Sequence, residues 1–299
     1  MPAEHSRIAA DLGSAAEHPA AALDLDLLRL PRKGRIYDLA SGWWPGMPVS
    51  EVHPPFQVLT YRTPRGQRAQ SDIAMLADNS VNFHFISELV MCTMHSGTHV
   101  DALSHVTCGS EDRWYGGDSA DDGLGDFGPL RHDACDLAPM ITRGIMLDVA
   151  SALGLSHLEA HHAITVEELE LAEEHGHVSR QPGDVVLIRT GTMGAWPVAE
   201  ELDRRDGAGI GADAAAWLLT RGPAAVGADN RGLEVAPSTI PGDPSPVHRI
   251  LLHEAGVPVL EWVNQEGLAE DRVYEFLFIC LPLTIRGATG SVVRPVAIA

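Results

Sequence analysis

The stretch DVVLIR at residues 184–189 decides the fold class, because four consecutive apolar residues stand between charged ones. A short apolar run of this kind is typical of a buried strand. After it the pattern becomes regular, with a helix near 212–221, a strand at 224–228, a helix at 246–255 and a strand at 257–261. This alternation predicts an α/β protein.

The other elements fit one domain over residues 35–299. A strand is predicted at 35–39, and partial alternation over 81–94 predicts a second one. Thr165 and Glu168 form a capping box that opens a helix ending near His175. Two long apolar strands follow near 274–281 and 291–298. No repeat or long linker divides the chain, and residues 1–34 are interpreted as an N-terminal arm or helix that packs on a neighbour.

Composition and charge exclude several functions. The chain has 299 residues, 45% hydrophobic and 21% charged, with a formal charge of −20 that repels nucleic acid and anionic membranes. No stretch is long enough for a membrane span, and no signal peptide is seen. The four cysteines form no CxxC pair, so we expect reduced thiols. These features predict a cytoplasmic protein that acts on a small molecule.

Residues 95–105, HSGTHVDALSH, are the strongest functional signal. His95 and His99 are four apart and would project from one face of a helical turn, while Asp101 adds an oxygen ligand. Two nitrogens and one oxygen leave coordination positions open, as in catalytic metal sites. Gly97 permits close backbone approach. His105 stands one turn further along as a proton carrier, and the alternation at 81–94 places the cluster after a strand.

A second pair with the same spacing, His157 and His161, serves as a comparison. It lacks a nearby glycine and stands just before a helix start, so we interpret it as a chance pair. Cys92 and Cys108 flank the main cluster and could be soft ligands, but the role of small buried hydrophobic residues is favoured.

The C-terminal half supplies further candidates. In the helix from Pro246, His248 falls on the apolar stripe with Leu251 and Leu252, so it faces inward, as either a core histidine or part of a site. Glu261 ends a strand, and the carboxyl ends of strands are where α/β proteins gather ligand sites. Both could reach one crevice. Asp229, after another strand, is interpreted as structural or as a support for the site.

Two loops complete the candidate pocket. The tryptophans Trp43 and Trp44 lie in a proline-rich loop, where they could contact a flat apolar substrate or cover the core or an interface. Phe56 and His53 are expected near the same pocket. The glycine-rich turn at 287–291 lacks the lysine of a phosphate-binding loop and is interpreted as a tight connection whose amides line the pocket.

The chain resembles the metal-dependent cyclase family, whose better-known members are bacterial kynurenine formamidase and isatin hydrolase. The family signature HxGTHxDxxxH matches residues 95–105. Supporting similarity appears at 35–39, 143–148, 183–191, 248–261 and 287–291, so it covers nearly everything after residue 34.

The resemblance implies a swivelling β/β/α single domain with a mixed sheet, usually a homodimer or a dimer of dimers, that hydrolyses amide or related bonds with Zn²⁺ or Mn²⁺. It implies that His95, His99 and Asp101 bind a first metal and that His105 transfers protons. Asp101, His248 and Glu261 would bind a second metal in the two-zinc branch, whereas the isatin hydrolase branch uses one manganese.

One departure bears on the substrate. Bacterial kynurenine formamidases carry a tryptophan followed by Pro-Gly-Asp in the early loop, whereas this chain reads MPVSE at 47–51, with Ser50 in place of the aromatic residue. This disfavours kynurenine-type substrates. We expect Ser50, Trp43, Trp44 and Phe56 to contact the substrate instead.

The function predicted from the sequence is cleavage of a C–N bond in a small cyclic amide or formamide by metal-activated water. The metal would lower the pKa of the water toward roughly 7 and bind the developing oxyanion. Two alternatives remain open at this point. The same site could hydrolyse a lactone or ester, or the chain could be a metal-dependent binding protein without catalysis.

Overall fold

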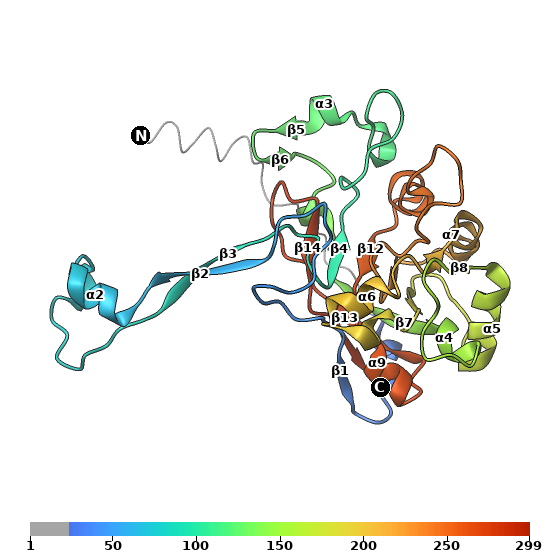
Figure 1. Ribbon diagram of the computed structural model, residues 1–299, viewed down its shortest axis with the longest axis horizontal. Helices are drawn as coiled ribbons and strands as arrows, with labels where there is room; N and C mark the ends of the chain where they lie inside the picture. The colour runs from blue at the N-terminus through green and yellow to red at the C-terminus, as the bar shows by residue number, and fades with distance from the viewer. Residues whose placement is uncertain (1–23) are drawn as a thin grey trace.

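The computed structural model describes residues 24–299, and across these residues nine strands form one mixed sheet (Figure 1). The α/β class and the mixed sheet predicted from the sequence are therefore confirmed. In sheet order the strands are β1 (Ile36–Asp38), β15 (Val296–Ile298), β13 (Glu275–Cys280), β7 (Met140–Asp148), β9 (Val185–Arg189), β11 (Ala225–Ala228), β12 (Val259–Glu261), β4 (His99–Asp101) and β14 (Gly290–Val292).

The centre of the sheet is parallel and buried. Strands β7, β9, β11 and β12 run parallel, and the flanking pairs are antiparallel. Every residue of β9 is buried, which explains the uninterrupted apolar run at 185–188. Successive residues of β9 belong to two different apolar clusters, as expected for side chains that alternate between two covered faces.

Helices cover the sheet on both sides. Leu169 of α5 and Leu218 of α7 belong to one cluster, and Leu268 of α9 belongs to the other. The capping box of Thr165 and Glu168 begins α5 as predicted. The α-helices are α2 (Pro64–Gln70), α3 (Ala120–Gly123), α4 (Val149–Ala152), α5 (Val166–Gly176), α6 (Ala199–Asp203), α7 (Ala212–Leu219), α8 (Pro246–His248) and α9 (Glu266–Glu270).

Short helices and strand pairs make up the connections. Within residues 24–299, no helix has the length and apolar character needed to cross a membrane. The short helices are η1 (Leu25–Arg29), η2 (Ala74–Leu76), η3 (Tyr115–Gly117), η4 (Ala134–Asp136), η5 (Thr192–Ala195) and the π-helix η6 (Arg249–Ala255), and the small strand pairs are β2 (Gln57–Arg62) with β3 (Ser87–Met91), β5 (Leu124–Gly125) with β6 (Gly128–Pro129), and β8 (Ala163–Ile164) with β10 (Gly209–Ile210).

The strand predicted over 291–298 is instead two short strands at distant places in the sheet order. β14 pairs with β4 at one end, whereas β15 pairs with β1 and β13 at the other. Only residues 293–295 separate them, and Pro295 has no N–H group with which to extend a ladder. Three residues span at most about 10 Å, so the sheet must curl until its two ends approach one another.

The strand predicted over 81–94 is also placed differently. β3 occupies only 87–91 and pairs with β2 outside the main sheet. Together with α2 these strands form a long projection, residues 57–91, that we call the arm (Figure 1). The strand predicted over 81–94 is therefore confirmed only at 87–91 and leads toward the metal cluster from outside the main sheet, whereas β4 itself carries His99 and Asp101.

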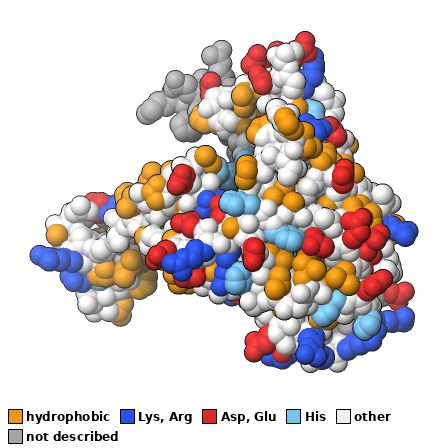
Figure 2. All heavy atoms as spheres, turned by 45° about the vertical axis from the view of Figure 1, so that its right-hand side comes forward, with side chains coloured by type: hydrophobic (Ala, Val, Ile, Leu, Met, Phe, Trp, Pro, Cys, Tyr) orange, Lys and Arg blue, Asp and Glu red, His pale blue; other side chains and the backbone are white. Residues whose placement is uncertain are grey.

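The arm exposes apolar side chains on both faces. In its antiparallel register Val58 lies opposite Val90, and Leu59 lies opposite Leu89, so neighbouring pairs point to opposite sides. Figure 2 shows the arm standing out from the body, with hydrophobic side chains along it and basic ones at its end. Its exposed large apolar residues are Val58, Leu59, Tyr61, Met75, Val81, Phe83, Ile86, Leu89, Val90 and Met91.

The predicted N-terminal arm or helix over 1–34 lies mostly outside the described residues. Its described part contains η1, in which no residue is buried. The helix predicted at 246–255 is present, but it continues from α8 as the π-helix η6 and ends at Gly256, whose φ is +67°.

Candidate metal centre

β4 carries two of the predicted ligands into the curled end of the sheet. His99 and Asp101 are two residues apart on this strand, so their side chains lie on the same face. The register pairs His99 with Glu261 of β12, and Asp101 with Gly290 of β14. All three predicted ligands of these strands are buried. The prediction that His95 and His99 share a helical turn is wrong, because residues 95–98 form a turn and His99 begins the strand.

Gly97 gives this turn its shape. Its φ is +58°, and a Cβ at this position would stand 2.6 Å from Ser41 Oγ and 2.9 Å from Met47 Cε. No other residue type fits both the backbone conformation and the space. Trp43 closes the turn from outside, because its Nε1–H donates to the Ser96 carbonyl at 2.7 Å.

His99 presents one nitrogen to the centre. Its Nδ1 lies 2.7 Å from the Gly97 carbonyl, which can only accept, so this nitrogen carries the proton. Nε2 then faces two carboxylates, 3.4 Å from Asp101 Oδ1 and 3.5 Å from Glu261 Oε2. Nε2 is therefore the nitrogen that could bind a metal once it has lost its proton.

His248 approaches from the opposite side on the helix that continues into η6. Its Nδ1–H donates to Glu234, and its Nε2 lies 3.2 Å from Glu261 Oε1 and 3.7 Å from Asp101 Oδ2. π-Helical turns often occur at functional sites, and this one begins directly after His248. The sequence prediction that His248 faces inward and reaches one crevice with Glu261 is confirmed by these contacts.

His95 and His105 lie on another side of Asp101. His95 Nδ1 is 2.7 Å from Asp101 Oδ1, and its Nε2 is 3.0 Å from Thr289 Oγ1. The His105 ring stacks on the His95 ring with centroids 3.9 Å apart. The His53 ring also stacks on that of His95, at 5.4 Å. His53 is thus the early-loop residue that reaches the centre.

Burial and the neighbouring carboxylates have opposite effects on the pKa values of the histidines at the centre. Burial disfavours the His99 imidazolium, but the hydrogen bond to Asp101 and the charges of Asp101 and Glu261 outweigh burial and raise the pKa of His99 to about 9. In the same way Glu234 and Glu261 overcome burial and raise the pKa of His248 well above its usual value.

His105 behaves in the opposite way. Burial is the largest cause, and it lowers the pKa of His105 to about 4, because the attraction of Asp101 compensates it only in part and the charge of His95 opposes protonation. His105 is therefore neutral at pH 7 and can accept a proton.

The donor set fits a divalent cation. Two groups of three side chains bring one ligand atom each to within 4.8 Å of one another, namely His95 with Asp101 and His105, and His99 with Asp101 and Glu261. Asp101 belongs to both groups, and among residues 24–299 its fully buried Oδ2 has no hydrogen-bond partner. A buried carboxylate oxygen without a partner is costly, and a cation would satisfy it.

The residues predicted to bind substrate have mixed positions. Trp43 lies against the ligand turn. Trp44 packs edge-on against Trp196, whose ring lies 5.4 Å from that of Trp262, so it belongs to an aromatic row beside Glu261. Phe56 is buried, and Ser50 is half-buried in the early loop, where its carbonyl accepts from the His53 N–H at 2.9 Å.

The remaining candidates are structural. Asp229 accepts from the backbone N–H groups of Thr190 and Gly191 at 2.8 Å each and from the Thr190 hydroxyl, so it ties the end of β9 to the end of β11. His157 and His161 bond to neighbouring oxygen atoms and belong to neither ligand group.

Sequence reasoning missed Glu234 and Thr289, which contact His248 and His95. Thr289 lies in the glycine-rich turn that was expected to line the pocket only with amides. Glu234 follows β11 in an irregular loop and carries no local pattern that marks it. Neither contact could be found without knowing which histidines lie beside them.

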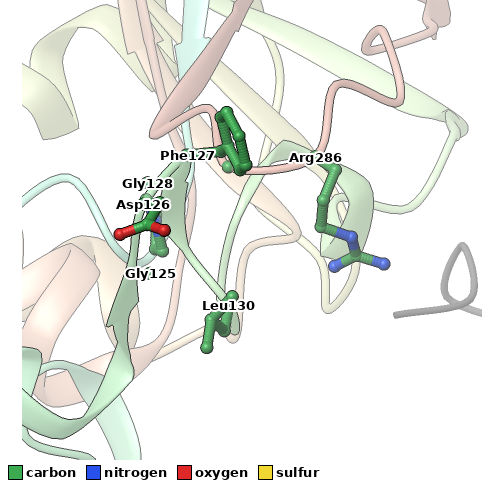
Figure 3. Close-up of a pocket in the computed structure, with 8 residues that line it drawn as sticks. Gly125, Asp126, Phe127, Gly128, Leu130 and Arg286 are labelled. Atoms are coloured by element: carbon green, nitrogen blue, oxygen red, sulfur yellow. The ribbon is translucent and has the colours of Figure 1, made fainter. Parts of the chain in front are cut away.

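A pocket of about 240 Å³ opens next to the same turn. Figure 3 shows the side chains of Phe127, Leu130 and Arg286 around it. Gly128 and Gly287 let the β5–β6 hairpin touch the turn, because a Cβ on Gly128 would stand 2.1 Å from the Gly287 carbonyl oxygen. Arg286 is held by the buried Asp133 at 3.2 Å.

Comparison with known proteins gives one family and several similar structures. The profile of the Cyclase family, described as "Putative cyclase", matches residues 37–235. No curated protein sequence matches the chain. A solved structure of a novel cyclase shares 26% identity, with a TM-score of 0.78 and 92% of each chain covered.

Two more distant structures share the fold. Isatin hydrolase A from Labrenzia aggregata, bound to benzyl benzoate, has 18% identity and a TM-score of 0.64, over 88% of this chain and 93% of that chain. A predicted metal-dependent hydrolase from Bacillus stearothermophilus has 19% identity and a TM-score of 0.55, over 88% of this chain and 97% of that chain.

Proposed function

We propose that this chain, which belongs to the cyclase family, is a metal-dependent hydrolase that cleaves a C–N bond of a small cyclic amide or formamide. The observation that carries the proposal is the convergence of His95, His99, His248 and Glu261 on Asp101, whose buried Oδ2 has no hydrogen-bond partner among the described residues and lies 3.7 Å from His248 Nε2. The fold is shared with an isatin hydrolase, and isatin is a cyclic amide.

The residues of the centre divide the work. His95, His99 and Asp101 would hold a first Zn²⁺ or Mn²⁺, and Asp101, His248 and Glu261 a second. Such an ion supplies Lewis acidity, which lowers the pKa of water and stabilises negative charge on a carbonyl oxygen. His105, neutral at pH 7, accepts a proton from the attacking water and returns it to the leaving nitrogen.

The assembly proposed with this function is a homodimer, or a dimer of dimers, built through the arm. An isolated two-stranded ribbon is only marginally stable in water, and exposed apolar patches of this kind mark interfaces. The arm carries three arginines and three acidic residues, so the net charge of −20 lies entirely on the rest of the chain. Arg65 and Arg68 of α2 thus complement the acidic body of a second copy.

We also propose that the protein is located in the cytoplasm. The chain has four cysteines and no CxxC pair, a usage typical of proteins in a reducing compartment.

The test compares the second histidines of the two HxxxH pairs. His99→Ala should lose bound metal and activity together, because it removes a nitrogen that faces both carboxylates. His161→Ala is the matched control, since His161 is exposed and its side chain contacts the Ala236 carbonyl, away from the centre. Metal content by elemental analysis is read beside hydrolysis of cyclic amides, formamides and lactones.

The outcomes separate the proposed function from its rivals. Turnover of amides or formamides supports it. Turnover of lactones alone would assign the site to ester chemistry. Full metal occupancy without hydrolysis of any substrate would favour a binding protein, and an His99→Ala variant that keeps its metal would refute the site.

A further inference from the structure

Glu234 and Thr289 each contact the outer nitrogen of one imidazole at the centre. We infer that they are positioning residues which set the metal affinities of two separate positions, Thr289 through His95 and Glu234 through His248. The inference rests on the proposed function, in which both histidines bind metal. It goes further in assigning a separate support to each position.

Glu234 fixes the orientation of His248. Its carboxylate accepts from His248 Nδ1 and, at 3.1 Å, from the Val247 backbone N–H. Because a carboxylate at neutral pH only accepts, His248 Nδ1 keeps its proton, and Nε2 is the nitrogen that faces Asp101 and Glu261 and would give up its proton to bind a cation. A carboxylate behind a metal-binding imidazole also raises its basicity as a ligand.

The backbone around Glu234 is held in place. Ile210 of β10 donates to the Leu233 carbonyl at 3.1 Å and accepts from Val235 N–H at 3.0 Å, on either side of Glu234. Gly209 packs so closely that a Cβ there would stand 2.4 Å from the Glu234 carbonyl carbon. Glu234 is itself buried. The carboxylate is thus presented to His248 by a rigid support.

Thr289 has the corresponding role for His95. Its backbone carbonyl accepts from Ala102 N–H at 2.9 Å, which locks it to the ligand strand, and its Oγ1 lies 3.0 Å from His95 Nε2. The next residue, Gly290, leaves room for the ring, since a Cβ there would stand 2.8 Å from His95 Cε1.

A hydroxyl suits this position because it can donate and accept. While His95 Nδ1 donates to Asp101, the hydroxyl of Thr289 donates to Nε2. If His95 Nδ1 instead bound a cation, Nε2 would carry the proton and the same hydroxyl would accept it. One contact therefore holds the ring in both tautomers.

The two supports belong to different parts of the fold. Thr289 stands before β14 and Glu234 follows β11, and the two imidazoles that they hold approach different oxygens of Asp101, His95 at Oδ1 and His248 at Oδ2. Each support should therefore influence its own position.

The experiment is a crossed titration of the chelator-treated full chain with Zn²⁺, and separately with Mn²⁺, against a competing chelator. Thr289→Val should weaken the binding of one metal equivalent by about 10- to 100-fold and leave the affinity for the other nearly unchanged. Glu234→Ala should weaken the second equivalent and leave the first nearly unchanged. Thr289→Ser, which keeps the hydroxyl, should restore wild-type affinity. Glu234→Gln keeps an acceptor oxygen, so it should lose less metal affinity than Glu234→Ala. It replaces the alanine variant in the experiment if that variant does not fold.

Thermal unfolding of the metal-free variants checks that each is folded. The inference is overturned if both substitutions weaken both equivalents alike, which would indicate a general structural role, or if neither changes any affinity. It is also overturned if the wild-type chain binds one equivalent only. In that case the proposed function still stands, provided that His99→Ala removes this equivalent together with activity.

Discussion

The neutral imidazole of His105, stacked on His95 at 3.9 Å, is the side chain best placed to move a proton. Its pKa of about 4 leaves it unprotonated through the neutral range, so it can act as a base without first losing a proton. One ring nitrogen of His105 lies within 4.8 Å of the ligand atoms of His95 and Asp101, where it could also bind a cation. Geometry alone allows both roles.

We predict that His105→Ala lowers kcat by about 100- to 10,000-fold while bound metal is retained, because proton transfer is lost and the ligands remain. Steady-state kinetics and elemental analysis on the same preparation check this. His157→Ala, at a half-buried histidine outside the centre, should behave as wild type. Loss of metal in the His105 variant would show that this residue is a ligand.

Metal affinity should also depend on pH, because a histidine ligand must lose its proton before it binds a cation. Cations bind the neutral imidazole, and the pKa of His99 is raised to about 9, so near pH 7 binding must displace a proton. Affinity should therefore rise about tenfold per pH unit for each proton displaced, from pH 6.5 toward 9, and level off above.

Calorimetric titration in buffers of different ionisation enthalpy measures this proton release directly. Release of at least one proton per ion at pH 7 is expected. Equal affinities at pH 6.5 and 8.5, with no dependence on the buffer, would contradict the prediction.

At the scale of elements, the ends of β9 and β11 are joined by one carboxylate. Asp229 is completely buried and accepts three hydrogen bonds from Thr190 and Gly191. Burial is the largest cause and raises the pKa of Asp229 to about 6, although the bonds from Thr190 oppose this. Above pH 7 the group is ionised and satisfies all three donors.

We predict that Asp229→Asn lowers the free energy of unfolding by about 1–3 kcal/mol at pH 7.5, because the amide cannot accept from every donor and leaves one buried N–H unpaired. Urea unfolding measures the change. Asp213→Asn, on the exposed start of α7, should change stability by less than about 0.5 kcal/mol. If the two variants are equally stable, Asp229 does not tie the strands together.

Helices and strands could be predicted from the sequence where the interactions that form them lie within a few residues of one another. The buried run at 185–188, the capping box of α5 and the helix start at Pro246 each reflect interactions within a few residues. The strand predicted over 81–94 is confirmed only at 87–91, and the single strand predicted over 291–298 is two short strands, because apolar alternation does not report which strand is the neighbour. The curl of the sheet decides that instead.

At the scale of the whole molecule, the arm is a surface that one copy of the chain leaves uncovered. Val90→Lys keeps the ribbon register but places a charge on one apolar face, so we predict a shift from dimer toward monomer. Light scattering after size-exclusion chromatography, over a range of concentrations, gives the mass. Leu171→Lys, at an exposed apolar residue of α5, is the matched control and should leave the dimer intact.

A wild-type chain that is monomeric at micromolar concentration would refute the proposed assembly. A Val90→Lys variant as dimeric as wild type would show that the arm is not the interface.

The sequence by itself determined the α/β class, the central buried strand and the HSGTHVDALSH cluster, because each depends on residues close together in the chain. The sequence also identified His248 as a candidate because it lies on the apolar stripe of a helix, and Glu261 because it ends a strand. Only the tertiary structure decided that Glu234 and Thr289 hold two of the imidazoles, and that His53 stacks on His95. These contacts join residues that are 14 to 194 positions apart. They arise from the curl that brings β4, β12 and β14 together, and no local pattern encodes that curl.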